Sequence, residues 1–183
     1  MDEAGTAEGL VDTRTRYFEM TVWPHARSAY NLARWLARNA QDAEDIVQDA
    51  FLKAFQAIGD FRGGDARAWT LAIVRNTAMS HLRRRKPDAP LDLSETEPAD
   101  ASPGAEQELL RRSRREEVRR AIAQLEPEFR EALVLREIEG LSYKEIAAVL
   151  DIPAGTVMSR LARARQRLLA TLGPRKEVHG DLF

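Results

Sequence analysis

Apolar residues recur along this chain at intervals of three and four, and no stretch sustains the apolar–polar alternation of a strand. That spacing gathers apolar side chains on one face of a helix, so the pattern predicts an all-α protein. We expect two small helical domains joined by a flexible acidic linker, with a helix-turn-helix in the C-terminal one. The expected segments are a flexible N-terminus (1–12), a first domain (13–87), a linker (88–110), a second domain (111–172) and a tail (173–183).

Composition argues against several classes of protein. No apolar run approaches the roughly 20 residues that cross a bilayer, and residues 1–12 carry acids but no Lys or Arg, unlike a secretory signal. We therefore expect a cytoplasmic protein. The absence of cysteine excludes disulfides and thiolate metal sites. The histidines are widely spaced, at His25, His81 and His179, so we expect neither a metal nor a cofactor.

The net charge of −1 is unevenly distributed. Residues 1–86 hold 13 basic against 11 acidic side chains, residues 87–110 hold none against 7, and residues 111–183 hold 15 against 11. The middle segment has four prolines and too little apolar surface to fold. We interpret it as a linker, either a solvated spacer or an acidic mimic of nucleic acid that occupies a basic channel.

Capping and stop signals place the helices. In the first domain we expect helices over Thr15–Val22, Pro24–Arg38, Asp42–Gly59 and Asp65–Lys86, with Asp42 as the cap of the third. In the second domain we expect helices over Glu106–Leu125, Glu126–Gly140, Ser142–Leu150 and Ala154–Leu172. Ser142 and Glu145 have the spacing of a capping box.

The last two helices and the short turn between them fit a helix-turn-helix. The second of them carries four arginines and no acid, as binding to a polyanion requires. Arginine also pairs with guanine edges, and a helix N-terminus accepts a phosphate. The candidate DNA-binding residues are Gly155, Thr156, Ser159, Arg160, Arg163 and Arg167. The alternative is a solvated basic face on an ordinary helical hairpin.

The Asp65–Lys86 helix presents a second candidate surface. Trp69, Asn76 and Arg83 are spaced by seven, so they nearly superpose, beside Ser80. A ring, an amide and a guanidinium suit the bases and phosphates of a single strand. The preceding loop Asp60–Asp65 holds Phe61, Arg62 and Gly63, and could form the wall of a pocket for an extruded base. Each feature has an alternative interpretation. Trp69 could pack in the core, the glycines could form a simple turn, and the run Arg83-Arg84-Arg85-Lys86 could be a solvated helix end.

The polar side of the Asp42–Gly59 helix is acidic and unsuited to DNA. It holds Asp45, Gln48, Asp49, Leu52 and Gln56. A leucine ringed by polar groups indicates a protein partner, although a single exposed leucine is also common.

These segments resemble extracytoplasmic-function sigma factors, the small initiation subunits of bacterial RNA polymerase. The resemblance rests on two motif sets in the family's order and covers about residues 14–172 without the linker. In the first domain it is carried by Asp42–Phe51 (DAEDIVQDAF), Phe61-Arg62-Gly63, Trp69 and Arg75-Asn76-Thr77-Ala78. In the second domain it is carried by Leu125-Glu126-Pro127, Leu141–Ala147 (LSYKEIA) and Gly155–Arg165 (GTVMSRLARAR).

The resemblance implies an alternative sigma factor, not an enzyme, whose partners are core RNA polymerase, promoter DNA and an anti-sigma factor. The Asp45–Gln56 strip would dock the clamp helices of the β′ subunit. The residues implied at the minus-ten element are Phe61, Arg62, Gly63, Trp69, Asn76, Ser80, Arg83 and Arg84. Those implied at the minus-thirty-five element are Gly155, Thr156, Met158, Ser159, Arg160, Arg163 and Arg167. Met158 and Ala162 depart from the family's usual residues, so the promoter sequence is left open.

Two other functions fit parts of the pattern. A helix-turn-helix regulator that binds operator DNA as a dimer would need no polymerase. An enzyme would need more than the clustered carboxylates Glu44, Asp45 and Asp49, and no nucleophile motif, phosphate loop or histidine accompanies them.

Overall fold

The computed structural model describes residues 13–37, 39–84 and 105–173. The predicted N-terminal segment, most of the linker, Arg85 and Lys86 of the basic run, and residues 174–183 lie outside this part of the chain. Every regular element of the described residues is a helix, which confirms the all-α prediction. None of these helices has the length and apolar content to cross a membrane.

The first domain begins with a helix over residues 13–21 and the 3-10 turn η1 (Trp23–His25). The helices α2 (Ala26–Leu36) and α3 (Ala40–Ala57), the 3-10 turn η2 (Ile58–Asp60) and α4 (Ala66–Arg84) follow. Pro24 lies in η1 and does not open α2. Its fixed φ suits either kind of helical turn.

The prediction that Asp42 caps α3 was wrong. The cap is Asn39, whose side chain accepts a hydrogen bond from the backbone N–H of Asp42 at 2.8 Å. Asp42 instead lies in the first turn, where a carboxylate interacts favourably with the helix dipole. Both residue types cap helices well, so the sequence alone left the start of α3 uncertain by a few residues.

The second domain contains α5 (Ala105–Ala123), α6 (Pro127–Leu133), the π-helical turn η3 (Val134–Ile138), α7 (Tyr143–Leu150) and α8 (Ala154–Leu172). The helix expected over Glu106–Leu125 is α5, so residues 105–110, which the expected domain bounds assign to the linker, belong to this helix. The predicted capping box is confirmed, since the Ser142 and Glu145 side chains each bond to the other residue's backbone N–H. Asp151 ends α7 with a φ of 54°, which turns the chain into α8.

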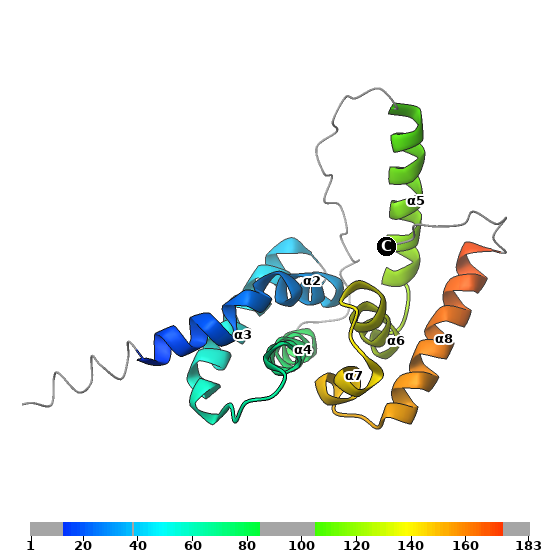
Figure 1. The fold of residues 1–183 in the computed structure, drawn as a ribbon. Helices are drawn as coiled ribbons and strands as arrows, with labels where there is room; N and C mark the ends of the chain where they lie inside the picture. Colours follow the sequence, from blue (N-terminus) through cyan, green and yellow to red (C-terminus); the bar gives the residue numbers. More distant parts are fainter. Residues whose placement is uncertain (1–12, 38, 85–104, 174–183) are drawn as a thin grey trace, which may run out of the picture.

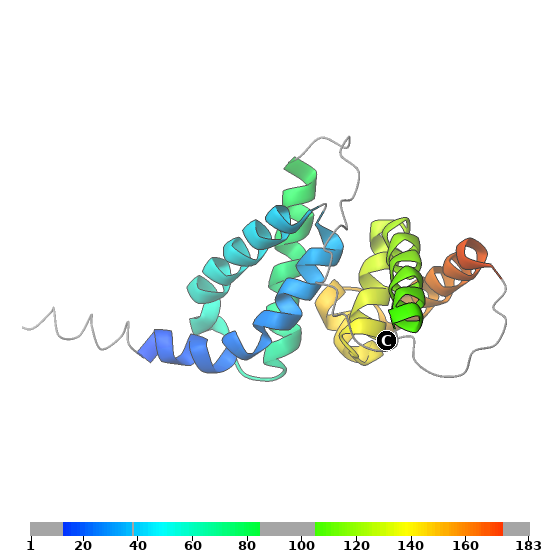
Figure 2. The same ribbon diagram turned by 90° about the horizontal axis from the view of Figure 1, so that it is seen from above.

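The two domains pack against each other, an arrangement that the sequence did not predict. Helix α4 contacts α7, and α2 contacts α6 and η3. Figures 1 and 2 show the domains side by side in both views. Most of the buried apolar residues form one continuous cluster across the contact, from Leu32 and Val74 in the first domain to Leu135 and Ile146 in the second.

Candidate nucleic-acid interface

Helix α8 separates its apolar and polar residues as predicted. Val157, Leu161 and Ala164 are buried in the core of the second domain. Five of the candidate DNA-binding residues are exposed, namely Gly155, Met158, Ser159, Arg163 and Arg167, and two are half-buried, namely Thr156 and Arg160. A side chain added at Gly155 would meet no protein atom, so the N-terminus of α8 is open to a ligand.

Two candidate arginines of α8 are held by their own domain. Nη1 of Arg160 donates to Oε1 of Glu131 at 3.0 Å. Arg167 pairs with Glu126 and lies over the ring of Phe129, 4.6 Å from its centre. No ion pair to Arg163 is present among the described residues. Arg163 is therefore the arginine of the predicted set that is most available to a phosphate.

Arg165, which faces η3, has a separate role in the second domain. Its guanidinium donates to Glu137 at 2.7 Å. This hydrogen bond raises the pKa of Arg165, and its effect exceeds that of burial, which lowers the pKa. The pair ties α8 to η3 and leaves Arg165 outside the DNA-binding candidates.

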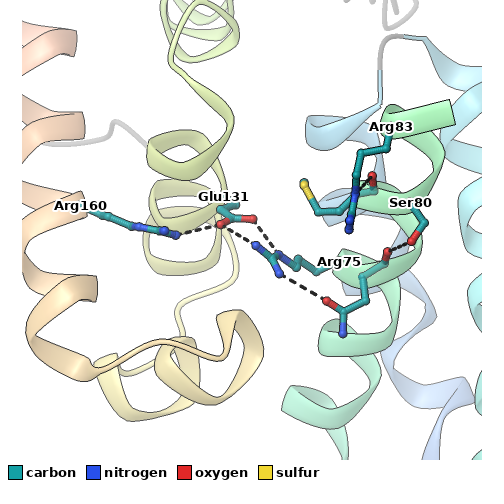
Figure 3. A network of polar contacts seen from close by, with 7 residues as sticks. Arg75, Ser80, Arg83, Glu131 and Arg160 are labelled. Atoms are coloured by element: carbon teal, nitrogen blue, oxygen red, sulfur yellow. Dashed lines mark hydrogen bonds and ion pairs between the residues drawn. The ribbon is translucent and has the colours of Figure 1, made fainter. Parts of the chain in front are cut away.

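The candidate surface on α4 is exposed at its centre and at its end. Asn76, Arg83 and Arg84 are exposed and Ser80 is half-buried. Ser80 Oγ donates to the Asn76 carbonyl at 2.9 Å, and Arg83 Nε donates to the Met79 carbonyl at 3.2 Å (Figure 3). The Asn76 side chain accepts a longer hydrogen bond, 3.3 Å, from Nη1 of Arg75.

A cavity of about 360 Å³ lies where the loop meets α4. Its walls include the loop residues Phe61 and Gly63, the α4 residue Trp69, and Ala148 from α7 in the second domain. The rings of Phe61 and Trp69 are 5.1 Å apart at an angle of 45°. Trp69 also packs beside the small buried cluster around Ile58, so it combines the core role and the pocket role that the sequence left open.

The backbone conformation of the loop explains why residue 63 is a glycine. Its φ is +86°, and that of Gly64 is +97°. Side chains rarely tolerate such values, so the two glycines set the path of the loop past the cavity.

The predicted protein-binding strip on α3 lies at the surface. Gln48, Asp49, Leu52 and Gln56 are exposed and Asp45 is half-buried. The Leu52 side chain is 62% exposed. Sequence reasoning missed its neighbour Trp23, which is also largely exposed. Trp23 stacks edge-on against Phe51 of α3 at 6.1 Å, which brings it beside this strip.

Sequence reasoning also missed the polar residues between the domains. Arg75 of α4 donates through Nε and Nη2 to the carboxylate of Glu131, at 2.9 and 3.1 Å. Arg67 of α4 donates to Glu139 at 2.6 Å. The sequence offered one signal for these contacts: Glu131 and Glu139 lie close to the apolar run Ala132–Leu135. Carboxylates buried beside such a run need charged or hydrogen-bonding partners. No three His, Asp or Glu side chains of the described residues gather into a metal site.

Comparisons with known proteins agree with this arrangement. A family model for sigma-70 region 2 matches residues 22–87, and one for sigma-70 region 4 matches residues 115–168. The RNA polymerase sigma-H factor of Pseudomonas aeruginosa is 37% identical over 169 residues, covering 87% of this chain and 88% of that protein. The ECF RNA polymerase sigma-E factor of Escherichia coli K12 is 42% identical over 138 residues, covering 69% of this chain and 72% of that protein.

Two solved structures are similar in fold and sequence. The sigma factor RpoE of Bartonella quintana, crystallised with the anti-sigma factor NepR, has a TM-score of 0.68 and 28% identity, covering 85% of this chain and 96% of that one. CnrH, solved with the cytosolic domain of CnrY, has a TM-score of 0.61 and 31% identity, covering 86% of this chain and 88% of that one. The matches run through both helical domains, and this chain belongs to the extracytoplasmic-function sigma factors.

Proposed function

We propose that this chain is an alternative sigma factor that binds core RNA polymerase, recognises the minus-thirty-five and minus-ten promoter elements, and assists promoter melting. The observation that carries the proposal is the order of two matching regions, region 2 and then region 4, in one chain. We assign the minus-ten and polymerase contacts to residues 13–87, the minus-thirty-five contacts to 111–172, and the connection to 88–110. The chain supplies recognition, core polymerase supplies the chemistry, and both act in the cytoplasm.

Polymerase docking is assigned to the α3 strip. An exposed leucine surrounded by Gln48, Asp49 and other polar groups has the make-up of an interface centre. The acids Asp45 and Asp49 suit a basic partner surface and would repel DNA. The strip therefore fits the clamp helices of the β′ subunit.

Capture of an unpaired base is assigned to the α4 surface and the cavity. Phe61 and Trp69 offer rings for stacking, Asn76 offers an exposed amide, and Arg83 and Arg84 are exposed cations that can contact phosphates. Extruding a base costs a few kcal/mol, and stacking returns about 1–3 kcal/mol per base. Because these terms nearly balance, melting assisted in this way needs no ATP.

Duplex recognition is assigned to α8 in the major groove. Its exposed residues can contact bases and phosphates, with Arg163 as the free cation among the described members of the set. Arg160 and Arg167 remain candidates. To contact DNA, each must either release the glutamate it is paired with or bind DNA while the ion pair stays formed.

We also propose control by an anti-sigma factor. RpoE of Bartonella quintana was crystallised with such a partner, and its structure resembles this chain through 85% of the chain's length. Leu52 in the α3 strip and Trp23 beside it are exposed apolar residues that offer a protein-binding surface. Competition for that surface would keep the chain from polymerase.

The decisive experiment is reconstitution of the purified chain with bacterial core polymerase on a library of promoters. We expect transcripts that start at a defined distance from paired minus-thirty-five and minus-ten sequences, and none from core polymerase alone. A chain that ignores core polymerase and binds a palindrome tightly as a dimer would support the conventional regulator instead.

A further inference from the structure

The first half of α5 extends beyond the rest of the second domain. In Figure 1 this helix runs past α6, α7 and α8, and its C-terminal part reaches the core, where Ala121 and Ile122 are buried. From residue 111 to residue 120 no side chain is buried. The helix therefore continues well beyond the part that packing supports, and this half is open to a partner.

This half of α5 is strongly basic. Residues 111–120 hold six arginines and two glutamates. Four of the arginines are exposed and belong to no ion pair among the described residues, and we call them the α5 stripe: Arg111, Arg114, Arg115 and Arg119. By contrast, Arg120 is paired with Glu116 at 3.0 Å and lies further around the helix.

The α5 stripe continues the packed side of the helix. Arg111 lies seven residues before Val118, which packs against the core. Arg115 lies seven residues before the buried Ile122. Residues seven apart share one side of a helix. This side of α5 therefore changes from apolar to basic where the core ends.

The stripe is unfavourable for the helix as long as no anion lies beside it. Like charges four residues apart on a helix repel each other, and Arg111, Arg115 and Arg119 form two such pairs. A solvated helix face usually mixes both signs of charge, as Arg120 and Glu116 do. The row of unpaired arginines therefore indicates an anionic ligand.

Duplex DNA suits the stripe in charge density and stiffness. From Arg111 to Arg119 the helix rises by about 12 Å, and a duplex carries one negative charge per about 1.7 Å of its axis. Each guanidinium can hold a phosphate through two hydrogen bonds. Arginines that contact phosphates position a duplex without reading its sequence.

The stripe and the N-terminus of α8 lie at opposite ends of the second domain (Figure 1). The duplex segment that α8 holds is therefore not the segment that the stripe contacts. On its downstream side the minus-thirty-five element leads to the minus-ten element and the first domain, which leaves the upstream side for α5.

We propose that the α5 stripe binds the phosphate backbone of the duplex upstream of the minus-thirty-five element, without sequence preference. This inference rests on the proposed function, in which α8 holds the element itself. The upstream duplex must curve toward α5, and the phosphate contacts with the stripe offset the energy of bending.

Promoter fragments of two lengths test the proposal with the holoenzyme. One ends at the upstream edge of the minus-thirty-five element, and the other continues upstream for about 30 base pairs. We expect the parent to bind the longer fragment on the order of tenfold more tightly. Arg111→Gln/Arg115→Gln should bind both fragments about equally, with its affinity for the short one unchanged. Its salt slope on the longer fragment should be smaller by about two.

Arg27→Gln/Arg120→Gln is the matched control, since it also removes two exposed arginines, one of them from α5. This variant should keep the advantage of the longer fragment. Contacts between core polymerase and upstream DNA are common to all three chains, so the differences among the chains report on the stripe. Circular dichroism checks that the helices are intact in each variant.

The inference fails if the upstream extension gives the parent no advantage, or if the stripe variant keeps that advantage. An equal loss on both fragments would assign the stripe to polymerase or to the element itself instead. Binding of the isolated chain to single-stranded RNA provides a further check, because a stripe-dependent preference for RNA over duplex DNA would contradict the proposal. A parent holoenzyme that binds neither fragment would contradict the proposed function, since the short fragment lacks the upstream duplex.

Discussion

Oε1 of Glu131, a side chain inside the protein, accepts a hydrogen bond from Nη1 of Arg160 at 3.0 Å. The arginine that the sequence assigns to the DNA face is therefore also part of the second domain's own structure. A variant of Arg160 will lose stability as well as any contact with DNA. Arg163, one turn further along α8, is exposed and gives a cleaner measure of DNA contact.

Arg160→Ala should lower the free energy of unfolding by about 1–3 kcal/mol, because a buried carboxylate loses one of its two arginines. Arg163→Ala should change it by less than about 0.5 kcal/mol. If Arg163 contacts phosphate, its loss should weaken promoter binding by the holoenzyme and reduce the salt slope by about one. Urea unfolding and binding titrations at several salt concentrations measure both effects. Unchanged promoter binding by the Arg163 variant would remove this residue from the interface.

Asn76→Ala should reduce transcription from duplex promoters more than from templates that are already melted, because captured bases offset the cost of opening the duplex. The amide is exposed, so the substitution should leave the fold intact. Gln124→Ala, which removes an exposed amide at the end of α5, serves as the control. Run-off transcription on the two template types provides the comparison. An equal loss on both templates, or no loss at all, would count against base capture by Asn76.

Leu52→Ala should weaken binding to core polymerase by roughly tenfold or more, the effect of removing a central interface residue. Leu169→Ala is a closely matched control, since Leu169 is 63% exposed against 62% for Leu52 and lies on α8. Competition with a labelled sigma factor for core polymerase measures the affinities. If the two alanine variants bind equally well, the α3 strip is not the docking surface.

Local signals sufficed for much of the fold. The capping box at Ser142 and the turn at Asp151 placed α7 and α8 correctly, because short-range hydrogen bonds and backbone geometry determine those ends. The sequence analysis missed the π-helical turn η3, which depends on tertiary packing. It also missed the cap at Asn39, because Asn and Asp cap helices almost equally well. The contact between Arg75 and Glu131 was beyond reach, because it joins residues 56 apart in sequence through the packing of two domains.

His25 provides a test of the first domain at mildly acidic pH. Burial, followed by the positive charge of Arg67, lowers the pKa of His25 below its ordinary value of 6.5, and Asp65 opposes the shift. Below about pH 6.5, His25 is protonated in the unfolded chain but still neutral in the folded chain. The free energy of unfolding therefore falls as the pH drops toward the lowered pKa, and then levels off.

His25→Gln should remove this contribution, so the variant should lose less stability than the parent between about pH 7.5 and about pH 5.5. Urea unfolding at each pH measures the free energies. A His25 variant with the same pH dependence as the parent would show that the lowered pKa of His25 does not contribute to stability in this range.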